Sequence, residues 1–88
     1  MSARWKKDPD ILATDLDDEV VLLHPKTRGM YTLNETGRVI WQLLASETRI
    51  DDAVAVLTAT FEVDDDTARA HAAKLFADLA AAGLIHKS

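Results

Sequence analysis

Apolar residues follow two different periods in this chain, and the period changes part-way along it. In the first part they come in short runs separated by Asp, Pro and Gly, which is typical of strands and turns. The second run ends at Pro25, which cannot donate a hydrogen bond to a strand ladder. Gly29, in the loop that follows, offers the positive φ of a hairpin turn. The runs predict strands over residues 11–14, 19–24 and 30–33.

After the third run, apolar residues recur at helical spacing nearly to the end of the chain. Asn34 and Asp64 are preferred N-cap residues, and Thr48 begins a stretch that resembles a capping box. Gly83 supplies a left-handed stop. Gly37, early in the first helix, permits that helix to lie close against the preceding strand. The predicted helices cover residues 34–45, 49–60 and 64–82.

Three strands followed by three helices predict an α+β fold built on an antiparallel sheet. The length of 88 residues favours one domain. We expect residues 1–9 to form a flexible N-terminal arm and residues 10–88 to form the single domain. Trp5, within the arm, either packs back on the domain, is disordered or marks a contact surface. The third strand is expected to lie at an edge of the sheet.

The composition limits the kinds of partner. The formal net charge is −5, so the chain as a whole repels nucleic acid and anionic membranes. It has no cysteine, which excludes disulfides, thiolate zinc sites and thiol catalysis. The N-terminus lacks the apolar stretch of a signal peptide, and no apolar run approaches the roughly 18 residues that span a bilayer. We therefore expect a cytoplasmic protein without a membrane partner.

The chain shows no pattern of catalytic chemistry. It contains no glycine-rich phosphate loop, no nucleophile elbow and no zinc motif. Its histidines, His24, His71 and His86, fall in different predicted elements without partners at ligand spacing. We expect no catalytic residues, no metal and no cofactor, and conclude that the chain is not an enzyme acting alone.

Two features of the pattern remain for a binding site. The strand over residues 30–33 is expected at a sheet edge, where free N–H and C=O groups accept another strand. On the third helix, Phe76 lies about 70–100° off the arc of residues that predicts the core face. In one interpretation Phe76 and Leu79 wall an apolar groove beside the edge strand. In the other, Phe76 completes the core and the edge is idle. The predicted core arc consists of Ala68, Ala72, Leu75, Leu79 and Ala82.

The junction between strand and helix also carries a family motif. Residues 29–44 read G-x-Y-x-L-N-x-x-G-x-x-I-W-x-L-L, and residues 79–85 read L-x-x-x-G-L-I. Their order and spacing resemble the pyrroloquinoline-quinone biosynthesis protein D family over about residues 10–86. The resemblance implies a small winged-helix-like domain of three strands and three helices. It also implies a precursor-recognition element of pathways that modify ribosomally made peptides.

In that family the leader peptide adds as a strand to the third strand and lies in a groove against the third helix. The resemblance implies peptide-binding residues on both elements: Met30, Tyr31, Thr32 and Leu33 on the strand, and Arg69, Ala72, Ala73, Phe76 and Leu79 on the helix.

The motif in a short stand-alone chain most resembles the leader-binding proteins of lasso-peptide pathways. There the implied partners are a cysteine-protease-like leader peptidase and an ATP-dependent macrocyclase. The quinone-cofactor branch instead implies a radical SAM enzyme as partner. Two further alternatives are a winged-helix DNA-binding protein, which the net charge opposes, and a structural subunit of a larger enzyme.

Overall fold

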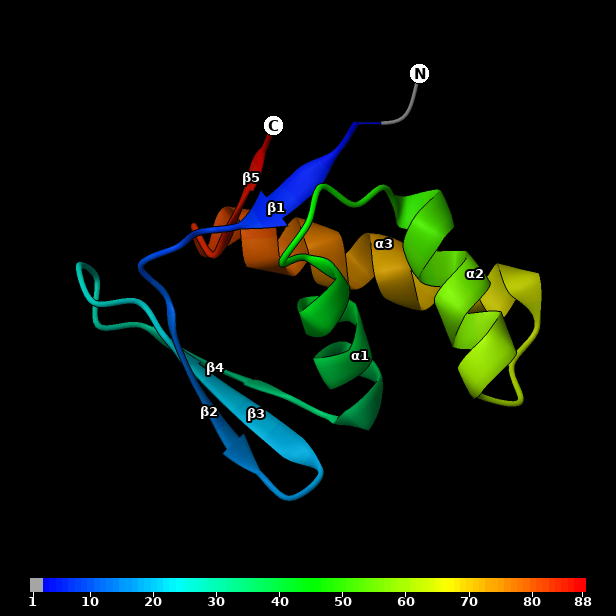
Figure 1. Ribbon diagram of the computed structural model, residues 1–88, viewed down its shortest axis with the longest axis horizontal. Helices are drawn as coiled ribbons and strands as arrows, with labels where there is room; N and C mark the ends of the chain where they lie inside the picture. Colours follow the sequence, from blue (N-terminus) through cyan, green and yellow to red (C-terminus); the bar gives the residue numbers. More distant parts are fainter. Residues whose placement is uncertain (1–2) are drawn as a thin grey trace.

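The predicted runs form strands and helices close to their expected positions (Figure 1). A computed structural model describes residues 3–88. A three-stranded antiparallel sheet precedes three helices, which confirms the α+β fold. No helix in this part of the chain is long and apolar enough to cross a membrane. The elements are β1 Trp5–Lys7, β2 Leu12–Leu16, β3 Glu19–Leu23, β4 Met30–Leu33, α1 Glu35–Leu43, α2 Ile50–Thr60, α3 Asp65–Ala81 and β5 Ile85–Lys87.

The sheet has the strand order β2-β3-β4, so β4 lies at an edge as predicted. In the loop between β3 and β4 the positive φ belongs to Arg28, at 60°, and the expectation that Gly29 adopts it is wrong. The Arg28 N–H donates to the carbonyl of His24 at 2.7 Å, and the His24 N–H donates to the carbonyl of Gly29 at 2.9 Å. These bonds close the loop, and its left-handed residue lies one position before the glycine.

Side-chain caps fix the ends of the helices. The Asn34 side chain accepts a hydrogen bond from the Gly37 N–H at 2.9 Å, and Asp64 accepts one from the Thr67 N–H at 2.8 Å. Both predicted caps are therefore confirmed, as is the left-handed Gly83, with φ of 74°. The prediction for Thr48 is wrong. Its hydroxyl donates to the carbonyls of Leu43 and Ser46, and α2 begins one residue later than the proposed box requires.

Gly37 brings α1 against β4. A Cβ atom at this position would lie 3.1 Å from Cβ and 3.2 Å from Cδ2 of Leu33. Gly37 is itself buried, so the close approach depends on the missing side chain, as the sequence predicts. The contact fixes the end of β4 relative to the first turn of α1.

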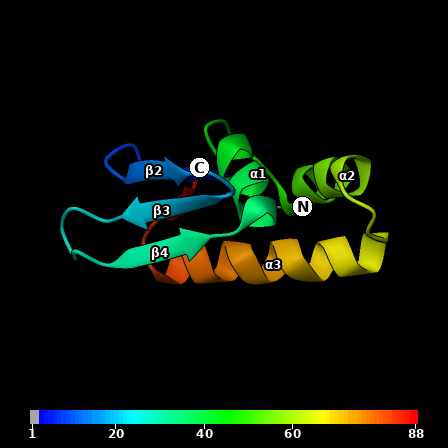
Figure 2. The ribbon, with the colours of Figure 1, turned by 90° about the horizontal axis from the view of Figure 1, so that it is seen from below.

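One core joins the inner face of the sheet to the helices. α1 packs on β3 and β4, and α3 packs on α2. Figure 2 shows β2, β3 and β4 side by side, with α3 running along the β4 side of the sheet. The fully buried large side chains are Phe76, Leu22, Leu33, Ile40, Leu44, Leu57, Leu79, Leu84 and Ile85.

Residues near both ends of the chain pair with each other, which the sequence did not predict. β1 pairs with β5 in antiparallel register, with Trp5 opposite Lys87. On its other side, Trp5 exchanges backbone hydrogen bonds with Thr48, each 2.8 Å long. The Lys87 ammonium lies 5.6 Å from the centre of the Trp5 ring, within cation–π range. Residues 1 and 2 of the expected arm lie outside the described residues, and residues 5–7 form this strand.

Candidate functional site

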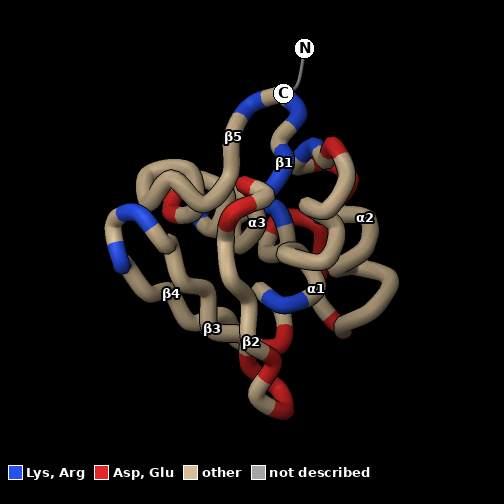
Figure 3. Tube along the Cα trace, turned by 60° about the vertical axis from the view of Figure 1, so that its left-hand side comes forward, with Lys and Arg blue, Asp and Glu red and all other residues tan. Residues whose placement is uncertain are grey.

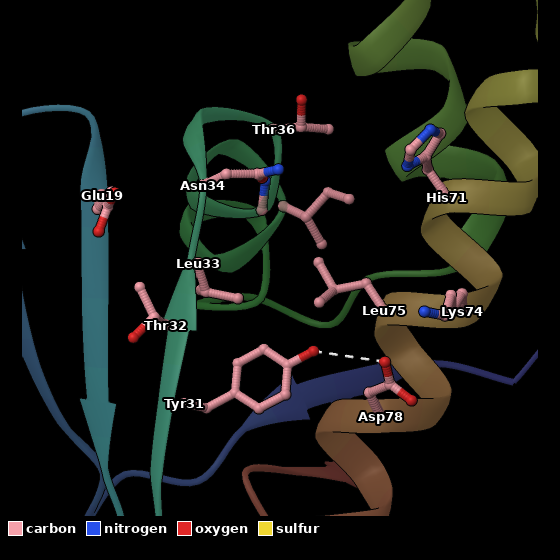
Figure 4. Close-up of a pocket in the computed structure, with 12 residues that line it drawn as sticks. Glu19, Tyr31, Thr32, Leu33, Asn34, Thr36, His71, Lys74, Leu75 and Asp78 are labelled. Carbon is pink, nitrogen blue, oxygen red and sulfur yellow. Dashed lines mark hydrogen bonds between the residues drawn. The ribbon is translucent and has the colours of Figure 1, made fainter.

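A groove of about 340 Å³ lies between β4 and α3 (Figure 4). One wall comes from β4 and the first turns of α1, and the other comes from α3. Figure 4 shows Tyr31 and Leu75 both pointing into the gap, with the Tyr31 hydroxyl directed at Asp78. The lining residues are Glu19, Tyr31, Thr32, Leu33, Asn34, Thr36, Gly37, Ile40, His71, Lys74, Leu75 and Asp78.

The free edge of β4 faces α3 (Figure 2). In an antiparallel pair, alternate residues direct their N–H and C=O groups to the partner strand. The bond from the His24 N–H to the Gly29 carbonyl makes these two residues a hydrogen-bonded pair. By alternation Tyr31 and Leu33 also bond to β3, since they follow Gly29 at intervals of two residues. Met30 and Thr32 therefore direct their backbone groups away from β3, toward the open edge.

A hydrogen bond crosses the groove near one end. The Tyr31 hydroxyl donates to Oδ2 of Asp78 at 3.4 Å, which is long for such a bond. Burial raises the pKa of the Tyr31 phenol, and the negative charge of Asp78 raises it further. The phenol thus stays protonated and joins β4 to α3 over 47 residues of sequence.

The groove combines apolar and charged walls. Leu33 and Ile40 are fully buried beneath it, whereas Leu75 is half-buried and offers apolar surface. Lys74 and Glu19 are exposed and bring charges of opposite sign to the rim. An open strand edge beside a groove with apolar and charged walls has the geometry that can pair with an extended peptide backbone.

A smaller hollow of about 50 Å³ continues the groove toward the connection between α2 and α3. Thr36 and His71 line both spaces. The remaining walls are mainly apolar, so the groove offers a second apolar position beyond His71. The sequence analysis missed it because its residues come from three helices and a connector: Thr36, Leu57, Phe61, Val63, Ala68 and His71.

The structure brings together the residues expected on the strand. Tyr31, Thr32 and Leu33 line the groove, and Met30 stands at the start of β4 with 70% of its surface exposed. The residues expected on α3 lie elsewhere. Ala72, Phe76 and Leu79 are buried in the core, with 0%, 2% and 0% exposure, and Arg69 and Ala73 are exposed outside the groove lining.

The prediction that Phe76 lies off the core face is therefore wrong, and the interpretation that Phe76 completes the core is confirmed. At 100° per residue, the buried residues of α3 span an arc of about 80° that includes Phe76. The groove lies on the flank of this arc that carries Leu75, and Arg69 and Ala73 lie on the opposite flank. Arg69 instead bonds to Asp51 on α2 at 2.7 Å. The helix is oriented so that the larger Phe76 side chain is buried in the core. In this orientation Leu75 lies at the groove.

Comparison with known proteins gives a family match and two similar solved structures. A family model described as coenzyme PQQ synthesis protein D (PqqD) matches residues 19–85. The structure of TbiB1 in complex with the TbiA(beta) leader peptide matches with 31% identity and a TM-score of 0.82, covering 92% of this chain and 94% of that chain. A lasso peptide synthetase B1 complexed with the leader peptide matches with 27% identity and a TM-score of 0.82, covering 96% and 99%. No curated protein matches the chain significantly.

Proposed function

The chain belongs to the PqqD family, and from this membership we propose that it binds the leader segment of a ribosomal precursor peptide and delivers it to modifying enzymes. The observation that carries the proposal is the groove between β4 and α3. In it, an open strand edge lies opposite a helix that presents both apolar and polar side chains. A strand edge binds main chain, and the groove walls select side chains.

The leader peptide adds as a fourth strand beside β4. The N–H and C=O groups of Met30 and Thr32 pair with its backbone, each bond contributing about 0.5–1.5 kcal/mol. Leader side chains opposite Tyr31 and Leu33 point into the groove and contact Leu75, because directly opposed residues share a face. Each apolar side chain that is fully buried there contributes about 1.5–3 kcal/mol. After the cost of ordering the peptide, micromolar or tighter binding is expected.

The lasso-peptide pathway is the best-supported setting. Both solved relatives are leader-peptide complexes, and one is named a lasso peptide synthetase B1. In this setting the chain acts in the cytoplasm without catalysis of its own. It presents the precursor to a cysteine-protease-like leader peptidase and an ATP-dependent macrocyclase. The gain comes from the high effective concentration of a peptide held beside its enzyme.

The family description favours one second candidate. It names coenzyme PQQ synthesis, so the alternative partner is a radical SAM enzyme acting on a bound precursor. Both candidates use the same groove and differ only in the enzyme that follows. A purified chain that stimulates leader cleavage supports the first, and one that stimulates only radical SAM chemistry supports the second.

Two proline variants test the strand-addition mechanism. Thr32→Pro removes an N–H that points to the open edge of β4, so the sheet itself loses no bond. Ala13→Pro is the matched control, since alternation directs the Ala13 N–H to the opposite edge, on β2. We expect Thr32→Pro to weaken leader binding, measured by titration calorimetry, by about 1–3 kcal/mol, because a leader carbonyl loses its donor.

Ala13→Pro should leave the affinity within twofold of wild type. Both variants should keep the far-UV circular dichroism spectrum and melting transition of a folded domain. Loss of affinity in Ala13→Pro alone would place the leader at the β2 edge and refute the groove assignment. Absence of leader binding by the wild-type chain would refute the proposed function itself.

A further inference from the structure

Part of the outer face of the sheet is apolar, and no helix formed by residues 3–88 covers it. Figure 2 looks onto the three strands with no helix in front of them. Strand register places Leu12, Leu23 and Met30 in one row across this face. The next row consists of Thr14, Val21 and Thr32, and beyond it Leu16 lies opposite Glu19. Leu12, Leu16 and Met30 are exposed by 58%, 53% and 70%. They are three of the four large hydrophobic side chains that are exposed within residues 3–88. Exposed apolar side chains that gather on one face make it a candidate interaction surface.

Opposite charges stand at the two ends of this face (Figure 3). The turn between β2 and β3 and its flank carry Asp18 and Glu19, and the loop between β3 and β4 carries Lys26 and Arg28. None of these four side chains takes part in an ion pair within the described residues. A partner that fits presents an apolar patch with cations toward the first end and anions toward the second.

The size of the face indicates which partner that is. Three strands of five residues or fewer cover about 14 Å by 17 Å, on the order of 240 Å². A stable dimer buries about 800 Å² on each partner, so the face is too small to hold a second copy by itself. It suffices for a partner that is already held nearby. An enzyme that grips one end of a peptide whose other end lies in the groove meets this condition.

The bound leader extends the same face. A strand added to β4 places the side chains opposite Met30 and Thr32 on the outer side of the sheet. The surface then consists of four strands, the last supplied by the peptide. An enzyme that docks on this surface contacts both the domain and the bound leader. It therefore distinguishes the leader-bound domain from the free domain.

We propose that the outer face of β2, β3 and β4 docks the enzyme that processes the bound precursor, through an apolar patch flanked by cations and anions. This inference rests on the proposed function and adds the surface through which the partner is engaged. Two parts of the sheet then have two different functions. The edge of β4 holds the leader, and the outer face recruits the enzyme.

The test uses the full chain, its precursor peptide and the leader peptidase of the same pathway. The double variant L12S/L16S removes apolar surface from β2 without touching the groove, and L12V/L16V keeps that surface with β-branched side chains. Leader affinity is measured by calorimetry, and kcat/KM is measured for peptidase cleavage of the precursor peptide bound to this chain. We expect L12S/L16S to bind leader within twofold of wild type and to lower kcat/KM at least tenfold, mainly through KM. L12V/L16V should behave as wild type.

Unchanged cleavage by L12S/L16S would overturn the proposal. So would an equal loss of leader affinity, because the substitutions would then act through β4. Sedimentation that shows a wild-type dimer dissociated by L12S/L16S would assign the face to a second copy instead. A wild-type chain that fails to bind leader would remove the proposed function, and this inference with it.

Discussion

Adjacent residues on α3, Leu75 and Phe76, offer a direct test of where the core ends and the groove begins. Phe76 is 2% exposed, and Leu75 is half-buried beside the groove. A buried Phe removes about 150–250 Å² from water, which at about 25 cal/mol/Å² amounts to about 4–6 kcal/mol. Phe76→Ala should therefore cost about 3–5 kcal/mol of unfolding free energy, a large part of the total for a domain of this size.

Leu75→Ala should lower leader affinity as well as stability, because Leu75 packs against the core and also lines the groove. If the leader covers the exposed part of this side chain, up to about a third of the 1.5–3 kcal/mol for a fully buried leucine is lost, or about twofold to fivefold in Kd. Urea unfolding followed by circular dichroism measures the stability of each variant, and calorimetry with a leader peptide measures affinity. Phe76→Leu, a milder change, keeps the domain folded and should retain wild-type affinity.

Leader affinity is the measurement that should distinguish the two positions. If Phe76→Leu kept full stability and lost leader affinity, Phe76 would belong to the groove and the assignment of the α3 faces would be wrong. If Leu75→Ala changed stability alone, the leader would not reach α3 at this position. In that case the peptide would be held by the strand edge without the helix wall.

Three other variants probe features that position the site. Gly37→Ala should destabilise the domain by up to about 2 kcal/mol in urea unfolding, because crowding against Leu33 exceeds the helix-propensity gain of about 1 kcal/mol. Arg28→Gly should raise stability by up to about 1 kcal/mol in the same assay, since Arg28 holds a φ of 60°. The hydrogen bonds from Thr67 lower the pKa of Asp64, so its stabilising contribution is present above about pH 4 and is lost as the pH falls through the lowered pKa. Asp64→Asn should therefore flatten the fall of Tm between pH 6 and 2; an unchanged pH profile would contradict this account.

Local signals were sufficient for most elements of the fold. Asn34, Asp64 and Gly83 mark helix ends because a cap depends on a side chain and its nearest backbone neighbours. The position of Gly37 likewise indicated a close helix–strand contact. Each of these features depends on an interaction between residues only a few positions apart in the sequence.

Features that depend on contacts between residues far apart in the chain could not be predicted from the sequence. β1 exists because Trp5 finds Thr48 on one side and Lys87 on the other, and nothing in residues 5–7 alone shows this. The strand residues that line the groove follow from the edge position of β4. The α3 residues that line it differ from those expected, because equal weight for every apolar residue put Leu75 in the core arc, whereas the larger Phe76 is the residue that is buried.

The pairing of β1 with β5 has a practical consequence for handling this domain. Trp5 lies opposite Lys87, and the Ser88 N–H donates to the carbonyl of Arg4 at 3.0 Å, so the two ends of the described chain leave the domain together. Figure 1 shows both ends on the side away from β2, β3 and β4. A domain whose ends lie together can be inserted whole into a surface loop of another protein, with its two junctions side by side. The same geometry permits a circular permutant with a short linker between the present ends and a new opening in the loop after α2.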